Sequence, residues 1–68
     1  MSYKRRNIIR ALREYGFDQT REGSNHTIFS DGRVSVPVPR HRQIASKTAM
    51  RIAQEIGVDW QQFKRKIL

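Results

Sequence analysis

The side chains of this chain best suited to proton transfer near neutral pH are its two histidines, His26 and His41. No two carboxylates occur at a spacing that suggests acid–base catalysis, and no glycine-rich phosphate loop is present, since Gly23 stands alone. The chain lacks cysteine, and no cluster of acids accompanies the histidines. We therefore expect neither a metal site nor a cofactor.

His26 directly follows Gly23-Ser24-Asn25, where a tight turn should open into a strand. A histidine beside phosphate-binding cations suits RNA cleavage, because RNA supplies its own nucleophile, the 2′-hydroxyl, and needs only proton transfer and charge stabilisation. Gly23 would let the backbone approach a phosphate closely, while Ser24 and Asn25 offer hydrogen bonds to phosphate or ribose. The residues alone leave a structural or simply exposed histidine as an open alternative.

The charge of the chain points to a polyanionic partner. Fourteen Lys and Arg residues against six acids give a formal net charge of +8 and a pI near 11.2. Such an excess on 68 residues favours nucleic acid as the partner, although solubility alone would also explain it. No apolar run approaches the length of a membrane span or a signal peptide core, so we expect a cytoplasmic protein.

The first element expected is a helix from about Tyr3 to Tyr15, capped by Ser2 and closed by a left-handed Gly16. Its apolar residues recur at helical spacing, and its arginines fall on the opposite side. The apolar stripe consists of Ile8, Leu12 and Tyr15, and the arginine face consists of Arg6, Arg10 and Arg13.

Three strands should follow, over residues 17–22, 26–30 and 33–38. Asp31-Gly32 predicts a type I′ hairpin, in which both central residues have positive φ. Strict alternation places Val34, Val36 and Val38 on one face of the third strand. Pro37 cannot donate a ladder hydrogen bond, so this strand should lie at an edge of the sheet.

Residues 39–46 are expected to form a loop, followed by a helix over Lys47–Ile56 with Ser46 as its cap. Asp59 should cap a short last helix, with Gln62 as its capping-box partner. The stripe of the second helix consists of Ala49, Ile52, Ala53 and Ile56; Trp60 and Phe63 of the last helix should pack on the core and leave Lys64, Arg65 and Lys66 exposed.

These elements predict one small α+β domain over residues 1–68, in the order α-β-β-β-α with a short C-terminal helix. The two amphipathic helices would cover one face of a three-stranded antiparallel sheet. The other face and the turns would stay open to a partner. A domain of this size has a thin core, because it buries only about 60% of the surface of its unfolded chain.

Several motifs, in order, make the chain resemble the HicA-type toxins, the mRNA interferases of HicAB toxin–antitoxin systems. They are "GF" at 16–17, "GSNH" at 23–26 followed by "IF", "DGR" at 31–33, "VPVPRH" at 36–41, Ile44, Thr48 and "IAQEIG" at 52–57. The resemblance runs from about Asn7 to Phe63. It implies a fold similar to a double-stranded RNA-binding domain and the activity of a type II toxin: metal-independent cleavage of mRNA, which stops translation.

By the same resemblance, His26 matches the catalytic histidine, and His41 is a candidate RNA contact or leaving-group acid. The partners implied are mRNA and a HicB-type antitoxin that covers the catalytic histidine. The expected RNA-binding residues are Gly23, Ser24, Asn25, Arg40, His41, Lys47 and Arg51. Asn25 stands where many relatives have histidine, and Lys47 where many have glycine, which leaves the start of the second helix open.

Two other functions remain open at this point. The chain could be a non-catalytic RNA-binding module, whose arginine face and basic tail follow an RNA duplex. It could also be a small interaction or DNA-associated protein whose second helix contacts its partner.

Overall fold

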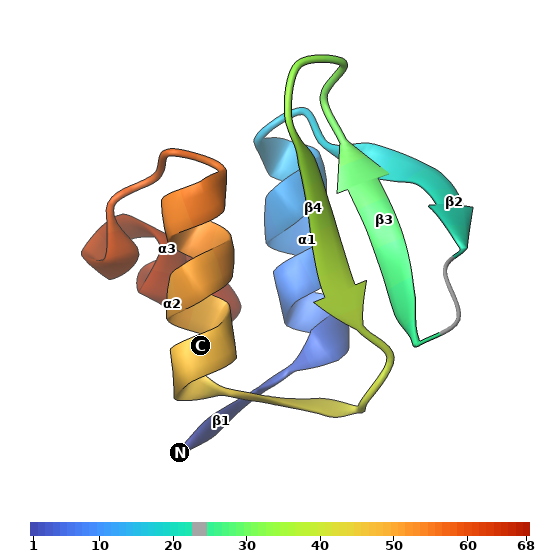
Figure 1. The fold of residues 1–68 in the computed structure, drawn as a ribbon. Coiled ribbons are helices and arrows are strands. Elements are labelled where there is room, and N and C mark those ends of the chain that lie inside the picture. The colour runs from blue at the N-terminus through green and yellow to red at the C-terminus, as the bar shows by residue number, and fades with distance from the viewer. Residues whose placement is uncertain (23–24) are drawn as a thin grey trace.

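The computed structural model describes residues 1–22 and 25–68 and contains a three-stranded antiparallel sheet packed against helices (Figure 1). The sheet has the order β2-β3-β4, and a second, two-stranded sheet pairs β1 with β5. The bounds are β1 Ser2–Lys4, α1 Arg5–Glu14, β2 Asp18–Glu22, β3 His26–Ser30, β4 Ser35–Pro39, β5 Gln43–Ala45, α2 Ser46–Glu55 and α3 Trp60–Ile67. The predicted α+β class and the α-β-β-β-α order are confirmed.

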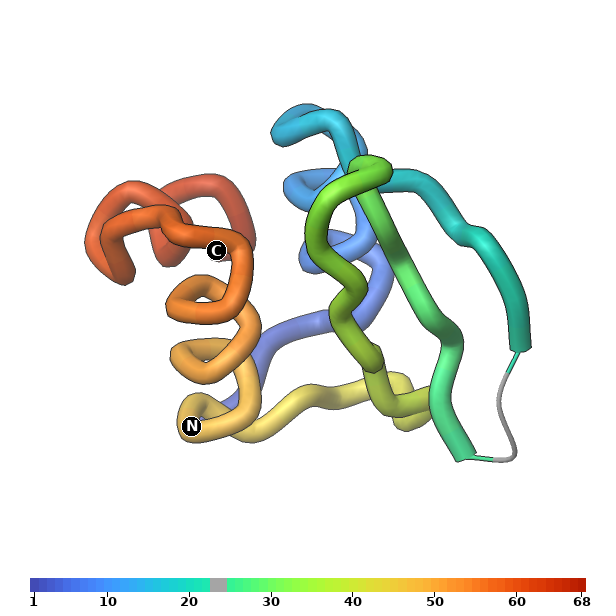
Figure 2. The backbone as a smooth tube through the Cα atoms, turned by 45° about the horizontal axis from the view of Figure 1, so that its top comes forward, coloured from blue at the N-terminus to red at the C-terminus, as the bar shows by residue number. Residues whose placement is uncertain are grey.

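The first helix is shorter than predicted. Residues 2–4 form β1 instead, and this segment passes beside the start of α2 (Figure 2). β1 pairs antiparallel with β5, in a register that places Tyr3 opposite Ile44. Both side chains are buried, and this tertiary pairing outweighs the local helix preference. Ser2 is therefore no helix cap; the N-cap position of α1 is Lys4, without a side-chain cap bond.

The stretch 39–46 is likewise not only a loop, since it contains β5. The N-cap of α2 is Ala45 rather than Ser46, whose hydroxyl instead donates to the backbone oxygen of Met1 at 2.9 Å. The ends of both helices agree with expectation. Gly16 and Gly57 follow α1 and α2 with φ of 89° and 76°, a region that glycine enters without steric penalty.

The sheet shows the predicted alternation on two of its strands. Thr27 and Phe29 of β3 are buried, as are Val36 and Val38 of β4, while their neighbours on both strands face the other side. β4 is an edge strand, as Pro37 predicted. Val34 is an exception, because it precedes β4 and is 40% exposed rather than buried.

The turn between β3 and β4 is not type I′. Gly32 has φ of 94°, but Asp31 does not have positive φ, which a type I′ turn requires of both central residues. The Asp31 carboxylate instead accepts the backbone N–H groups of Arg33 and Val34, each at 2.9 Å. The bonds from Val34 and Arg33 lower the pKa of Asp31, because they stabilise its charged form.

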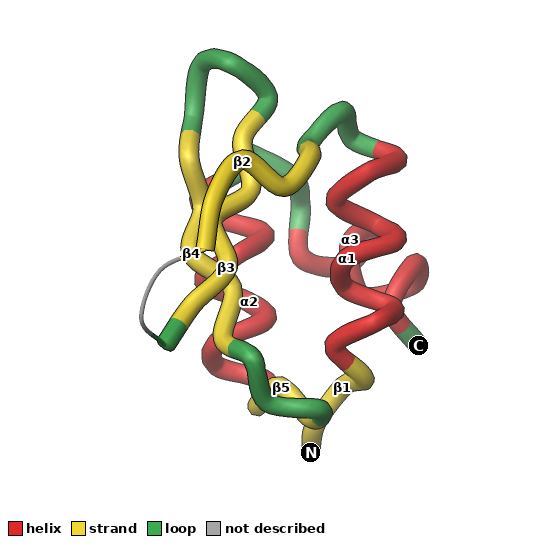
Figure 3. Tube along the Cα trace, turned by 90° about the vertical axis from the view of Figure 1, so that its right-hand side faces the viewer, coloured by secondary structure: helices red, strands yellow, loops and turns green. Residues whose placement is uncertain are grey.

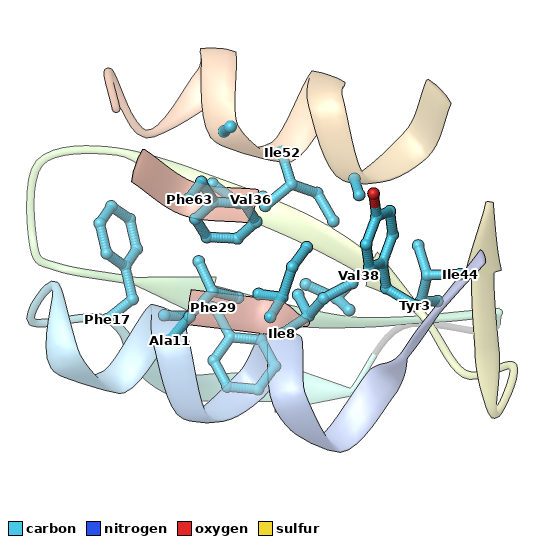
Figure 4. Close-up of a cluster of buried hydrophobic side chains, with 14 residues drawn as sticks. Tyr3, Ile8, Ala11, Phe17, Phe29, Val36, Val38, Ile44, Ile52 and Phe63 are labelled. Atoms are coloured by element: carbon cyan, nitrogen blue, oxygen red, sulfur yellow. The ribbon is translucent and has the colours of Figure 1, made fainter. Parts of the chain in front are cut away.

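The core lies between the sheet and the helices, and α3 closes it (Figure 4). Asp59 caps α3 as predicted, accepting the N–H groups of Gln61 and Gln62 at 3.0 and 3.4 Å. Phe63 and Ile67 are fully buried, and the partly buried Trp60 meets Tyr3 edge-on at 5.8 Å. In the described part of the chain, no helix has the length and apolar character needed to cross a membrane.

Truncating Phe63 tests whether α3 is an integral part of this core. Phe63→Ala should lower the free energy of unfolding by about 3–5 kcal/mol, because it removes buried contacts and leaves a cavity. Urea unfolding followed by circular dichroism measures the change. Gln61→Ala, an exposed site in the same helix, should change stability by less than about 0.5 kcal/mol. Equal stability of the two variants would contradict this account of α3.

Candidate nucleic-acid interface

The His26 side chain lies outside the hydrophobic core. His26 is the first residue of β3 and half-buried, and strand alternation places its ring on the face opposite Thr27 and Phe29. Its register partner is Pro39, the last residue of β4, so His26 sits at the end of the sheet where β3 begins and β4 ends (Figure 1). In this position the imidazole is accessible to a ligand.

The Arg40 side chain, just after β4, connects the end of β2 with the start of β3. Its Nη2 lies 2.9 Å from the Glu22 carboxylate at the end of β2 and donates to the His26 backbone oxygen at 3.3 Å. The same guanidinium therefore holds both ends of the β2–β3 connection. It also places a positive charge beside the first residue of β3, which is where a phosphate group near the imidazole would need one.

A buried threonine fixes the other side of this strand end. The Thr27 side chain is 3% exposed; its hydroxyl accepts from Arg5 Nη2 at 2.9 Å and donates to Glu22 Oε1 at 3.0 Å. Arg5 Nε also donates to the Pro39 backbone oxygen at 2.7 Å. These bonds tie the start of α1 to the ends of β2, β3 and β4, and so determine where the backbone of His26 lies.

Sequence reasoning missed Arg5, Thr27 and Glu22. One signal was available: the alternation that places Phe29 inside the core places Thr27 there too, and a buried hydroxyl needs hydrogen-bond partners. No local sequence pattern predicted a special role for Arg5, because the residues around it have the pattern of an ordinary amphipathic helix. Its role follows from contacts with residues more than twenty positions away in the sequence.

The remaining expected site residues that the structure describes lie in two places. Asn25 is exposed just before β3, and His41 is exposed in the β4–β5 connection, at the same end of the sheet as His26. Lys47 and Arg51 lie on α2, which Figures 1 and 2 show on the other side of β4 from β3. Gly23 and Ser24, also expected to bind RNA, lie outside the described residues.

The side chain of Arg51 already has a partner, since it forms an ion pair with Glu55 at 3.1 Å one helical turn away. Lys47 is exposed in the first turn of α2. Among residues 1–22 and 25–68, no three or more His, Cys, Asp or Glu side chains group closely enough to hold a metal ion. The chemistry that these residues offer is thus proton transfer by imidazole together with phosphate binding by cations.

Arg5 should matter for stability far more than its neighbour Arg6. Arg5→Ala should lower the free energy of unfolding by about 2–3 kcal/mol, because charged hydrogen bonds are lost and the buried Thr27 hydroxyl loses a donor. Arg6→Ala removes an equal charge from an exposed position and should have little effect. Arg5→Lys should restore only part of the loss, since an ammonium lacks the guanidinium fork. Urea unfolding measures the free energy of unfolding of all three variants. Equal stability of the two alanine variants would contradict the role of Arg5.

Comparison with known proteins agrees with the motifs. The sequence profile of a family described as HicA toxin of bacterial toxin–antitoxin systems matches residues 5–58 of the 68-residue chain. The match begins at the first residue of α1 and ends just before α3. Searches of curated proteins and of solved structures gave no significant match. The chain belongs to the HicA toxin family and is the toxin of a bacterial toxin–antitoxin system, with an antitoxin as its partner.

Proposed function

We propose that this toxin is a metal-independent endoribonuclease that cleaves mRNA in the cytoplasm and thereby stops translation. The observation that carries the proposal is the position of His26, on the open face of the sheet and next to the Arg40 guanidinium. A histidine packed inside the core would have spoken against it. Family membership supports a toxic activity, and the net charge of +8 supports a polyanionic substrate.

In the proposed reaction, His26 removes the proton of a ribose 2′-hydroxyl, and the resulting oxygen attacks the adjacent phosphorus. The bond between phosphorus and the 5′-oxygen breaks, so the products are a 2′,3′-cyclic phosphate and a 5′-hydroxyl. An acid must give the departing 5′-oxygen a proton, and His41, exposed at the same end of the sheet, is our candidate. Cations near the phosphate stabilise the negative charge that accumulates in the transition state.

Arg40, His41, Lys47 and Arg51 are the proposed phosphate contacts, with Asn25 and the undescribed Gly23 and Ser24 at the turn before His26. Arg40 is the one that the fold places directly against His26. Arg40 would have to exchange its ion pair with Glu22 for a phosphate, and Arg51 its ion pair with Glu55. Each exchange costs little, because an exposed ion pair contributes only about 0–1 kcal/mol.

Replacing His26 tests the proposal. His26→Ala should reduce the rate of RNA cleavage in EDTA by about 10²–10⁴-fold, because it removes the proton acceptor. Expression of the wild type should arrest bacterial growth, and expression of the variant should be tolerated. Ser35→Ala, an exposed change at the other end of the sheet, should leave cleavage unchanged. Undiminished cleavage by His26→Ala would remove His26 from the mechanism.

A non-catalytic RNA-binding module is the second candidate, favoured by the exposed arginine face of α1. Arg6, Arg10 and Arg13 all lie at the surface, as predicted from their spacing. Such a module would bind RNA tightly and in a salt-sensitive way, without turnover under any condition. The cleavage assay in EDTA separates the two candidates directly.

The antitoxin is proposed to act by covering His26. An acidic surface on the antitoxin would complement the positive charge of the toxin and favour rapid, specific association. The preformed complex should therefore cleave RNA far more slowly than free toxin, and raising the salt concentration should slow its formation. The assay compares cleavage rates of the complex and the free toxin at equal toxin concentration. Equal rates would contradict coverage of the site.

A further inference from the structure

A basic hollow opens where β1, the start of α1 and the β4–β5 connection meet. Its volume is about 590 Å³. Figure 3 shows the β4–β5 connection running past the lower end of α1 toward β1. The lining residues are Lys4, Arg5, Arg6, Ile9, Arg40, Arg42 and Gln43, so that, among the described residues, cations dominate the wall and no acid contributes to it.

Long-range pairing builds this hollow. Lys4 lies opposite Gln43 in the β1–β5 ladder, and the Arg5 backbone N–H donates to the Arg42 oxygen at 2.8 Å. Within the ladder, Tyr3 and its partner are buried, so alternation leaves Lys4 and Gln43 exposed on the opposite face. Cations from residues 4–6 and from residues 40–42, far apart in the sequence, thus line the same hollow.

Three of these cations have side chains without a bonding partner among the described residues. In the described part of the chain, the side chains of Lys4, Arg6 and Arg42 have no ion pair and no hydrogen bond. Some other surface cations are paired with acids, for example Lys66 with Glu14 at 2.8 Å. Clustered like charges repel one another, and a bound anion would relieve that repulsion. Guanidinium groups in particular match the oxygens of a phosphate.

The hollow adjoins the proposed catalytic histidine through two arginines. Arg40 lines it and also contacts the His26 backbone oxygen at 3.3 Å. Arg5 lines it and is held by Thr27, the residue after His26. Because the bonds to Thr27 and Pro39 fix the Arg5 guanidinium, this wall of the hollow is already organised before a ligand arrives.

We propose that this hollow is a second phosphate-binding site for the RNA strand, which holds a backbone phosphate next to, but not at, the bond that is cleaved. The inference rests on the proposed ribonuclease function. Phosphate contacts carry no base information, so the hollow contributes affinity and register rather than sequence choice. It should therefore matter only for RNA long enough to reach it.

A triple variant tests the site by binding. Lys4→Gln/Arg6→Gln/Arg42→Gln should bind a short 2′-O-methyl RNA, which cannot be cleaved, with a slope of log affinity against log salt that is smaller by about 2. Near about 0.1 M salt this corresponds to an affinity loss of about 100-fold. The control Arg33→Gln/Lys64→Gln/Arg65→Gln loses the same charge away from the hollow and should stay near the wild type. An unchanged slope in the first variant, or equal losses in both, would overturn the proposal.

Cleavage of substrates of two lengths gives a second reading. The variant with the altered hollow should cleave a dinucleotide, which has a single phosphodiester, as fast as the wild type. For longer RNA its KM should rise while its kcat stays the same. A lost dinucleotide activity would place these cations at the reacting phosphate and overturn the proposal. If the triple variant does not fold, the single variants Arg6→Gln and Arg42→Gln replace it in the binding experiment. Each should lower the slope of log affinity against log salt by about 0.7.

Failure of this inference is distinguishable from failure of the proposed function. Undiminished cleavage by His26→Ala would refute the proposed mechanism. The binding experiment uses RNA that cannot be cleaved, so it tests the hollow whether or not the mechanism is correct. The antitoxin offers the remaining alternative occupant. If the triple variant binds RNA normally but is no longer neutralised by the antitoxin, the hollow is a protein-docking surface and the proposal is overturned.

Discussion

The rest of this structure depends on the two hydrogen bonds of the buried Thr27 hydroxyl, which accepts from Arg5 and donates to Glu22. A hydroxyl in a core costs about 1–3 kcal/mol when it lacks partners, so its neighbours must supply both a donor and an acceptor. Here the donor comes from α1 and the acceptor from β2, while Arg5 also reaches Pro39 of β4. One satisfied network thus aligns four elements at the end of the sheet where His26 lies.

The positive charge of the chain serves two separable purposes. Some cations are structural: Arg5 holds the strand ends, and Lys66 pairs with Glu14, which raises the pKa of Lys66 and lowers that of the carboxyl. Others, such as Lys4 and Arg42, face a hollow without a partner among the described residues. Net charge therefore identifies the class of partner, but individual contacts decide which cations are available to bind it.

The part of the chain that defines the family is not the whole of its folded structure. The HicA match ends at residue 58, yet α3 contributes Phe63 and Ile67 to the core and is held by its own cap at Asp59. A thin core explains this arrangement, since a small domain gains proportionally more from each additional buried side chain. The last helix thereby stabilises the sheet that presents His26, without taking part in the proposed chemistry.

The sequence by itself determined the α-β-β-β-α order, the edge position of the Pro37 strand, the helix ends at Gly16 and the resemblance to the family, because these follow from local periodicity and backbone preference. The tertiary structure decided what depends on distant partners. The pairing of residues 2–4 with 43–45 turned an expected helix start into a strand. The same pairing brought Lys4 beside Arg42, and no local pattern encodes such a contact, because its free energy exists only once both segments are in place.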